Sequence, residues 1–234
     1  MAALLVGAVS WPSAAGSGAG EPEAATGTIV GRVTLDGPAP RVPPVAVGKH
    51  REFCGEERVP AALRLGPGRA VADALVVLEG EGLAGAAAPG RVTLDNRGCE
   101  FAPRVQVAAV GSDLEVLSSD PILHTAHAYL DRRQTLFHVA LPVFLSRRTV
   151  RLGRPGLVTI ECDVGHTWMR AFIWVTATGF AAVTDAAGRF RLDGVAPGRY
   201  RARVWHEILG ERALAVDVAP GQRLNVSVRY GEKP

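Results

Sequence analysis

Apolar and polar residues alternate with a period of two along most of the chain after residue 27. This period is typical of strands with one buried face, whereas an amphipathic helix repeats every 3.6 residues. Between Gly-, Pro- and Asp-rich turns, the alternation predicts short strands at residues 28–35, 71–78, 91–94, 104–110, 114–117, 157–161, 171–175, 180–184, 189–192, 200–205, 213–218 and 224–230. Many short strands at this spacing predict an all-β sandwich or barrel.

The composition is that of a globular protein. Of the 234 residues, 47% are hydrophobic and 21% are charged, which excludes a disordered chain and allows one large or two small domains. No apolar run reaches the roughly 18–20 residues that a membrane-spanning helix needs. The formal net charge is +3 and the basic residues are scattered, so a nucleic-acid partner is not expected.

Motifs of several enzyme classes are absent from the sequence. There is no Gly-x-Ser-x-Gly elbow, no His-Glu-x-x-His helix, no Walker A loop and no dinucleotide fingerprint. We therefore predict that the chain is not an enzyme.

The first residues have some features of a secretory signal. Residues 1–10 are mostly apolar, and Ser13 and Ala15 suit cleavage after Ala15, but the basic n-region is missing. We expect residues 1–26 to comprise a signal-like segment and a flexible linker, and the protein to be periplasmic or otherwise exported. An ordinary flexible tail is the alternative.

Three potential metal ligands occur close together between two predicted strands: Cys162, His166 and Met169. A tight Gly-containing loop would let their side chains converge. Thiolate and imidazole ligands select copper or zinc, and a thioether adds a preference for copper. A trigonal site of two histidines and one cysteine, with a weak axial methionine, needs one more histidine from elsewhere in the chain.

The other histidines differ in their expected roles. His124 follows a turn after the predicted strand 114–117 and is the preferred fourth ligand. His127 is its rival, and otherwise lies around the site or faces outward. His138 is interpreted as structural, and His50, near Cys54, as a surface residue.

Two segments near the ends of the chain resemble carboxypeptidase-regulatory-like (transthyretin-like) domains: residues 27–37 with 74–78, and residues 184–200. In the second segment, Gly188 suits a hairpin turn, and Phe190 and Tyr200 are expected to point inward from neighbouring strands. The halves are far apart, so we interpret them as one transthyretin-like or Ig-like sandwich with an insertion. Two sandwiches in series are the alternative.

The intervening segment resembles the cupredoxins (plastocyanin/azurin-like domains). The resemblance rests on Cys99-Glu-Phe101-Ala-Pro103-Arg-Val105, Gly111–Val116, Ser119-Asp120 followed by His124, and the Cys162-x₃-His166-x₂-Met169 loop, in that order. The combination is similar to bacterial proteins labelled methylamine utilisation proteins. It implies a cupredoxin-like Greek-key domain over 90–178, inserted into a regulatory-like domain of 27–89 plus 179–234.

The cupredoxin resemblance also implies a ligand set. His124, Cys162 and His166 would be the equatorial ligands of one mononuclear copper ion, and Met169 the axial ligand. Many cupredoxins have Asn directly after the first histidine, where it ties the two ligand loops together, but Thr125 stands here. The Cys-to-His spacing resembles half of a dinuclear CuA loop, but Val158 occupies the place of the other cysteine.

The remaining cysteines, Cys54 and Cys99, resemble positions carried by the composite family, which implies a disulfide between them. Such a bridge leaves Cys162 free as a thiolate, and contributes roughly 3–4 kcal/mol in the chain-entropy model. Because disulfides persist in oxidising compartments, the bridge also agrees with export. Two unpaired buried thiols are the alternative.

These features predict a single-electron carrier whose His166 faces the surface as the electron port and meets a redox protein partner. One alternative is a copper-handling protein that delivers Cu(I) to an acceptor or receives it from a donor. Another is a metal-free adhesion or carbohydrate-binding module. The motif Trp205-His206-Glu207 resembles a recurrent motif of the composite family and is either a buried structural pair or a partner contact.

Overall fold

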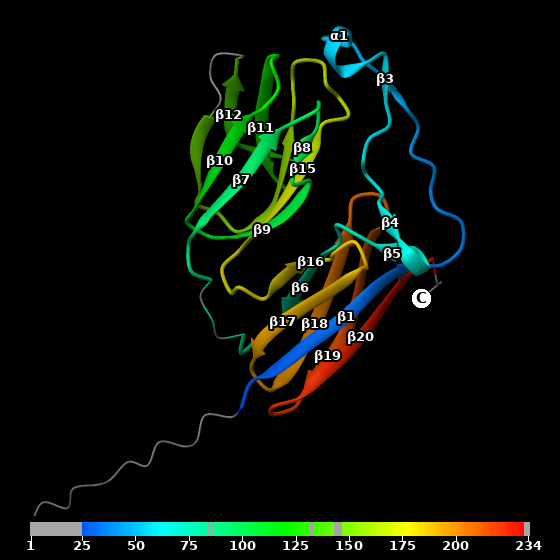
Figure 1. Cartoon of the computed structure of the whole chain (residues 1–234). Helices are drawn as coiled ribbons and strands as arrows, with labels where there is room; N and C mark the ends of the chain where they lie inside the picture. The colour runs from blue at the N-terminus through cyan, green and yellow to red at the C-terminus, as the bar shows by residue number, and fades with distance from the viewer. Residues whose placement is uncertain (1–24, 84, 86, 132, 143–146, 232–234) are drawn as a thin grey trace, which may run out of the picture.

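The computed structural model describes residues 25–83, 85, 87–131, 133–142 and 147–231. Strands form almost all of the regular structure in these ranges, so the all-β prediction is confirmed (Figure 1). The helical segments within them are α1 (Arg51–Cys54) and a short 3-10 turn at Pro67–Arg69. None is long and apolar enough to cross a membrane. The predicted signal-like segment lies almost wholly outside the described residues.

The two ends of the chain form one β-sandwich, here called the terminal sandwich (Figure 1). Its first sheet contains β1 (Gly27–Leu35), β4 (Leu65–Gly66), β5 (Ala70–Val71), β17 (Arg189–Val195) and β20 (Arg223–Tyr230). Its second sheet contains β6 (Leu75–Glu79), β16 (Ala181–Val183), β18 (Gly198–His206) and β19 (Gly210–Val218). Alternate residues such as Ile29, Val76 and Val204 fill the core between the sheets.

A second sandwich, here called the middle sandwich, lies beside one end of the first (Figure 1). One sheet contains β7 (Arg91–Asn96), β8 (Phe101–Ala102), β10 (Ser112–Ser118) and β13 (Arg147–Leu152). The other contains β9 (Val105–Ala109), β11 (His124–Leu130), β12 (Gln134–Leu141), β14 (Gly156–Glu161) and β15 (Arg170–Thr176). Leu94, Leu114, Ile160 and Ile173 are fully buried between these sheets, because the period of two turns them to one face.

The chain crosses between the two sandwiches. β6 pairs antiparallel with β16, with Val77 opposite Ala181, although all strands of the middle sandwich lie between them in sequence. Within the middle sandwich, β7 pairs parallel with β10, and β9 with β15. Parallel neighbours cannot be joined by a tight hairpin, so the chain passes from one sheet to the other between them.

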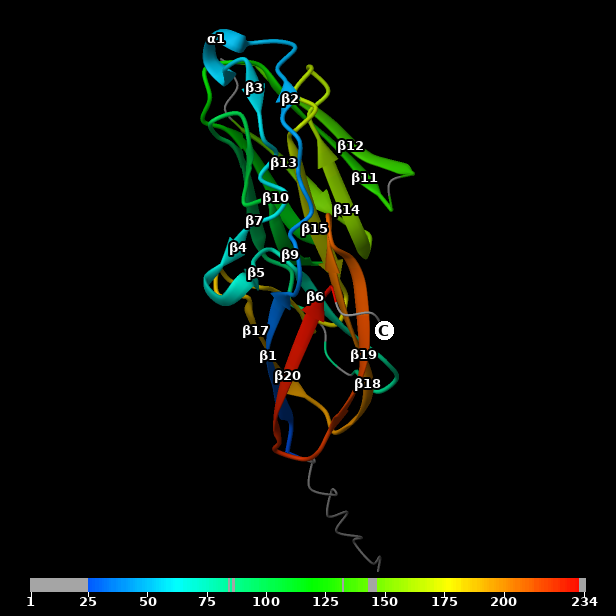
Figure 2. The ribbon, with the colours of Figure 1, turned by 90° about the vertical axis from the view of Figure 1, so that its right-hand side faces the viewer.

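A long connection, here called the strap (residues 36–64), leaves the terminal sandwich after β1 and returns to it at β4. It runs along the middle sandwich to the far end, where α1 lies, and contains β2 (Val45–Ala46) and β3 (Glu57–Arg58) (Figures 1 and 2). Val47 and Cys54 of the strap are buried in the core of the middle sandwich. The strap thereby brings residues near the N-terminus to the opposite end of the molecule.

The motif Trp205-His206-Glu207 lies where the two sandwiches meet. Trp205 packs edge-on against Phe172 with ring centroids 5.0 Å apart. Both carboxylate oxygens of Glu207 accept hydrogen bonds from Arg104, at 2.6 and 2.9 Å. The motif is thus an internal contact between the sandwiches.

Most predicted strands form, with differences in detail. The predicted strand 71–78 is broken into β5 and β6 around Asp73, whose φ of 59° is incompatible with a strand. The turn at Gly188 joins β16 to β17 in opposite sheets, so it is not a hairpin, and Phe190 and Tyr200 point inward from opposite sheets. β11, β12 and β13 were not predicted; in β11 the buried positions include alanines, which give a weak apolar signal.

Candidate metal centre

β11 places His124 and His127 on opposite faces of its sheet. His124, Ala126, Ala128 and Leu130 are buried, whereas His127 is partly exposed. The two histidines are three positions apart, an odd spacing that reverses the side of a strand. His124 therefore points into the middle sandwich and His127 points away from it.

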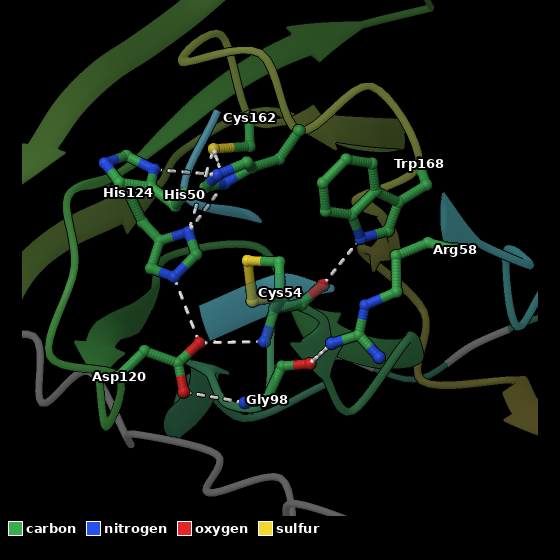
Figure 3. Close-up of a disulfide and its surroundings, with 10 residues drawn as sticks. His50, Cys54, Arg58, Gly98, Asp120, His124, Cys162 and Trp168 are labelled. Atoms are coloured by element: carbon green, nitrogen blue, oxygen red, sulfur yellow. Dashed lines mark hydrogen bonds and ion pairs between the residues drawn. A yellow bond between two sulfur atoms is a disulfide. The ribbon is translucent and has the colours of Figure 1, made fainter. Parts of the chain in front are cut away.

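Three potential ligand atoms converge at one end of the middle sandwich (Figure 3). Nδ1 of His124 lies 3.2 Å from Nδ1 of His166, and the sulfur of Cys162 lies 3.6 Å from His166 Nδ1 and 3.9 Å from His124 Nδ1. Cys162 directly follows β14 and is the free cysteine, while His166 belongs to the loop before β15. The structure thus brings together the three predicted equatorial ligands, His124, Cys162 and His166, as a close triangle.

The ring of His124 is oriented by Asp120. Its Nε2 donates a hydrogen bond to Oδ2 of Asp120 at 3.0 Å, because a carboxylate oxygen can only accept. Asp120 is itself fixed by the backbone N–H groups of Gly98 and Cys99, at 2.7 and 2.8 Å. With the proton on Nε2, the lone pair of Nδ1 points toward Cys162 and His166.

Thr125 ties the two ligand segments together. Its backbone N–H and its hydroxyl point at the sulfur of Cys162, at 3.5 and 3.8 Å. Its hydroxyl oxygen also accepts a hydrogen bond from the N–H of Asp163 at 2.8 Å. A threonine therefore joins the loops at the position where the family resemblance led us to expect asparagine.

The prediction that His166 faces the surface is wrong. Its side chain is 0% exposed, and its Nε2 lies 3.1 Å from Nδ1 of His50. The interpretation of His50 as a surface residue is also wrong, because this half-buried side chain packs against His166 with the two rings at 62°. The sequence could not place it, since 116 positions separate the two histidines.

A disulfide holds the strap against the centre. Cys54 and Cys99 are bonded, as predicted, with their Cα atoms 5.8 Å apart. The carbonyl of His50 accepts the N–H groups of Phe53 and Cys54, so the bridge anchors the short helix that follows His50. On the other side, the indole N–H of Trp168 donates to the carbonyl of Cys99 at 2.8 Å. The bridge therefore links His50, Asp120 and the ligand loop.

Burial sets the protonation states of the three convergent groups. It lowers the pKa of His166 to about 4, with the nearby His124 and His50 adding to the effect. It also lowers the pKa of His124, against the opposing influence of Asp120, and raises the pKa of the Cys162 thiol. At neutral pH the centre thus presents two uncharged imidazoles and a thiol, whose proton leaves when a metal ion binds.

Met169 belongs to the same apolar core as Cys162 and ends the ligand loop. It is buried, and its N–H donates to the carbonyl of His166 at 2.9 Å. Met169 and Cys162 line one surface groove of about 290 Å³. Its predicted axial role stays a prediction.

The remaining histidines lie elsewhere. His127 and His138 stack on the outer face of the β11–β12 pair, with ring centroids 4.2 Å apart. His206 is buried in the terminal sandwich region, and its Nδ1 accepts the N–H groups of Ile208 and Leu209. Neither His138 nor His206 contacts the triangle.

Sequence reasoning missed Asp120 and His50 as partners of the ligands. Asp120 could have been found, because it precedes His124 by four positions and directly follows a predicted strand and turn. No local signal marks His50, since only the path of the strap brings it to the centre.

Comparison with known proteins gives structural similarities only. No protein-family model matches the chain, and no curated protein is significantly similar in sequence. A purple cupredoxin from Nitrosopumilus maritimus is 16% identical, with a TM-score of 0.32, over 37% of this chain and 99% of that protein. The oxidised plastocyanin of Dryopteris crassirhizoma is 12% identical, with a TM-score of 0.32, over 36% of this chain and 100% of that protein.

Part of this chain is also similar to part of a larger copper protein. The copper-containing nitrite reductase from Thermus scotoductus is 24% identical, with a TM-score of 0.32, over 42% of this chain and 25% of the reductase. All three similarities cover less than half of this chain. Two of these three proteins are named as a cupredoxin and a plastocyanin, and the third is a copper-containing nitrite reductase.

Proposed function

We propose that this chain is an exported copper protein that carries a single electron. His124, Cys162 and His166 would hold one copper ion, with Met169 as the axial ligand. The observation that carries the proposal is the buried triangle of two imidazole nitrogens and one sulfur.

The dimensions and chemistry of the triangle fit this metal. Donor atoms each about 2.0–2.3 Å from one ion lie roughly 3.3–3.8 Å apart. The measured separations of 3.2, 3.6 and 3.9 Å are close to this range. Thiolate, imidazole and thioether donors together select copper over hard cations such as Mg²⁺ or Ca²⁺.

When bound, copper supplies a Cu(II)/Cu(I) couple that gains or loses one electron. The protein residues hold the donors in place in both oxidation states. Asp120 keeps the proton of His124 on Nε2, and Thr125 donates hydrogen bonds to the sulfur, which influences the reduction potential. His166 is fully buried and its Nε2 meets Nδ1 of the half-buried His50, so we place the path of the electron through this contact.

The two sandwiches support the proposed domain assignment. We assign residues 27–89 plus 179–234 to a carboxypeptidase-regulatory-like domain, and 90–178 to an inserted cupredoxin-like domain. The pairing of β6 with β16 and the two separate apolar cores support this division. The Cys54–Cys99 disulfide supports export, because such bonds persist in oxidising compartments.

Copper addition to the purified full chain tests the function. One equivalent of Cu(II) should produce an intense thiolate-to-Cu(II) absorption, a matching EPR signal and a reversible one-electron potential. His124→Gln and Cys162→Ser should each abolish the absorption. His127→Gln is the matched control, because this histidine faces away from the centre, and it should retain the absorption. If no thiolate-to-Cu(II) absorption appears, the electron-carrier proposal is wrong.

Cu(I) handling is the second candidate, because Cys162 and Met169 are soft donors that suit Cu(I). A Cu(I)-handling protein should bind one Cu(I) ion tightly, as measured by competition with a chelator, and should not show the thiolate-to-Cu(II) absorption. A metal-free module predicts no copper uptake and no effect of Cys162→Ser. The same titration therefore distinguishes the electron carrier from both alternatives.

A further inference from the structure

A second group of metal-binding side chains lies on the outside of the middle sandwich. It consists of His127 on β11, His138 on β12 and Asp163, which follows Cys162. Their side chains are 18%, 48% and 41% exposed, so solvent reaches all three. His127 and His138 are directly opposite each other across the β11–β12 pair, which turns both rings to the same face.

Both imidazole rings lie close to the same carboxylate oxygen of Asp163. Nδ1 of His127 lies 2.7 Å from Oδ2 of Asp163, and Nε2 of His138 lies 3.3 Å from the same oxygen. Ligands each about 2.0–2.2 Å from one ion lie roughly 2.8–3.1 Å apart at right-angled bond angles and roughly 3.3–3.6 Å apart at tetrahedral ones, so these separations are close to those of a shared metal ion.

The two rings are nearly parallel, at 13°. A common ion therefore requires His138 to rotate about its side-chain bonds. Its half-exposed position on β12, an edge strand of the sheet, allows this rotation.

Neighbouring residues prepare His127 for this role. Its Nε2 lies 3.2 Å from the hydroxyl of Thr135, which can accept the ring proton and leave Nδ1 as the ligand atom. The hydroxyl of Tyr129 lies 2.8 Å from Nδ1 and has to turn aside when an ion binds. Within the described part of the chain, the ion pairs of Asp163 are with these two histidines, and none is with Arg or Lys.

We propose that His127, His138 and Asp163 form a second metal site, which binds a divalent transition-metal ion and prefers Cu(II). Two imidazoles and one carboxylate suit Cu(II) and Zn(II), and Cu(II) is bound more tightly by such donors. The groove of about 290 Å³ that Cys162 and Met169 line is also lined by Asp163. An ion at the second site therefore lies beside the groove that leads to the buried donors, whether or not the buried centre carries electrons.

The test uses the full chain with Cys162→Ser, which removes the thiolate from the buried centre. Zn(II) is added while the ring signals of the histidines are followed by NMR, and Cu(II) is added in a parallel EPR titration. The ring signals of His127 and His138 should shift with Zn(II), and Cu(II) should show nitrogen and oxygen coordination without thiolate absorption. Adding His138→Gln should weaken Cu(II) binding at this site at least tenfold.

Asp217→Asn in the same background is the matched control, because Asp217 is an exposed carboxylate paired with Arg199 in the terminal sandwich. It should leave the affinity unchanged. Equal Cu(II) affinity with and without His138→Gln, or Zn(II) shifts confined to His124 and His166, would overturn the proposal. If the Cys162→Ser variant does not fold, the Zn(II) titration of the wild-type chain tests the shifts of His127 and His138 instead. If the wild-type protein shows no thiolate absorption with Cu(II), the electron-carrier proposal is contradicted, but the proposal of a second metal site is not.

Discussion

The alternation of side chains between the two faces of β11 decides which histidine reaches the candidate centre. His124 and His127 are chemically equivalent and close in sequence, but only His124 shares the buried side of β11 with Ala126 and Ala128. Asp120 and Thr125 then fix the ring and the facing sulfur by hydrogen bonds. At the scale of the residue, the centre depends on these few polar contacts inside an apolar core.

Thr125→Val tests the contact between the ligand segments. The substitution removes the acceptor of the Asp163 N–H and one donor to the Cys162 sulfur while keeping the side-chain shape. We expect a loss of about 1–2 kcal/mol in the free energy of unfolding, because the N–H is left without its partner. Urea denaturation measures the loss. Thr125→Ser keeps the hydroxyl and should stay near wild type, so an equal loss in both variants would contradict the role of the hydroxyl.

The buried His206 makes the stability of the fold depend on pH in the acidic range. Burial lowers its pKa from the ordinary value of 6.5 to about 4. The unfolded chain therefore takes up a proton between these values that the folded chain does not, and stability falls as the pH drops from 6.5 toward 4. At pH 5 this histidine should cost about 2 kcal/mol of stability relative to pH 8.

His206→Asn isolates this contribution, because asparagine keeps an acceptor for the N–H groups of Ile208 and Leu209 but does not titrate. Urea denaturation at pH 8 and pH 5 should show a smaller loss in the variant, by about 2 kcal/mol. The buried histidines of the candidate centre affect both proteins equally. The same pH dependence in wild type and variant would exclude His206 as its source.

At the scale of the element, the strap is the feature that sets this centre apart. It carries His50 across the length of the middle sandwich and is fastened there by Cys54 and by the buried Val47. The short helix α1 could not hold this position alone, since four residues form barely one turn. We therefore expect the disulfide to be needed to keep His50 against His166.

Replacing Cys54 and Cys99 by serine tests the strap. The double variant should lose roughly 3–4 kcal/mol in the free energy of unfolding, because the unfolded chain gains freedom. Hydrogen exchange of the Phe53 and Cys54 backbone amides should also become faster, since their bonds to His50 no longer persist. The Cys162→Ser variant keeps the bridge and is the control. Unchanged exchange at residues 53 and 54 would show that packing alone holds the strap.

At the scale of the whole molecule, two cores are joined by an interface that contains a largely buried ion pair. The side chains of Arg104 and Glu207 are only 11% and 9% exposed, and form two hydrogen bonds. Phe172 and Trp174 of the middle sandwich and Trp205 of the terminal sandwich belong to one apolar cluster at the junction. Removal of one charge would leave the other buried without its partner, which is costly in such a place.

Glu207→Ala should lower the free energy of unfolding by about 3–5 kcal/mol. It should also separate thermal unfolding of the two sandwiches into two calorimetric transitions, because the junction no longer couples them. Asp217→Ala breaks the exposed pair with Arg199 and should cost less than about 1 kcal/mol. Similar losses in the two variants, with one transition in each, would show that the ion pair does not couple the sandwiches.

Local pattern was sufficient for the all-β class and for most strands, because the period of two reports which face of a strand is buried. It was also sufficient to single out the loop from Cys162 to Met169, whose donor types lie within a few positions of each other. The strand at residues 124–130 escaped prediction because Ala126 and Ala128 fill its buried positions. With that strand recognised, the same alternation would have given a second reason to prefer His124 to His127.

The tertiary structure alone decided what surrounds the loop. His50 and His166 meet across 116 positions, and Arg104 meets Glu207 across 103. No periodicity links such residues, because their contact follows from how separate sheets and the strap pack together. The sequence by itself thus determined the strands and the donor set, whereas long-range packing determined that the centre is covered and that the two sandwiches are joined.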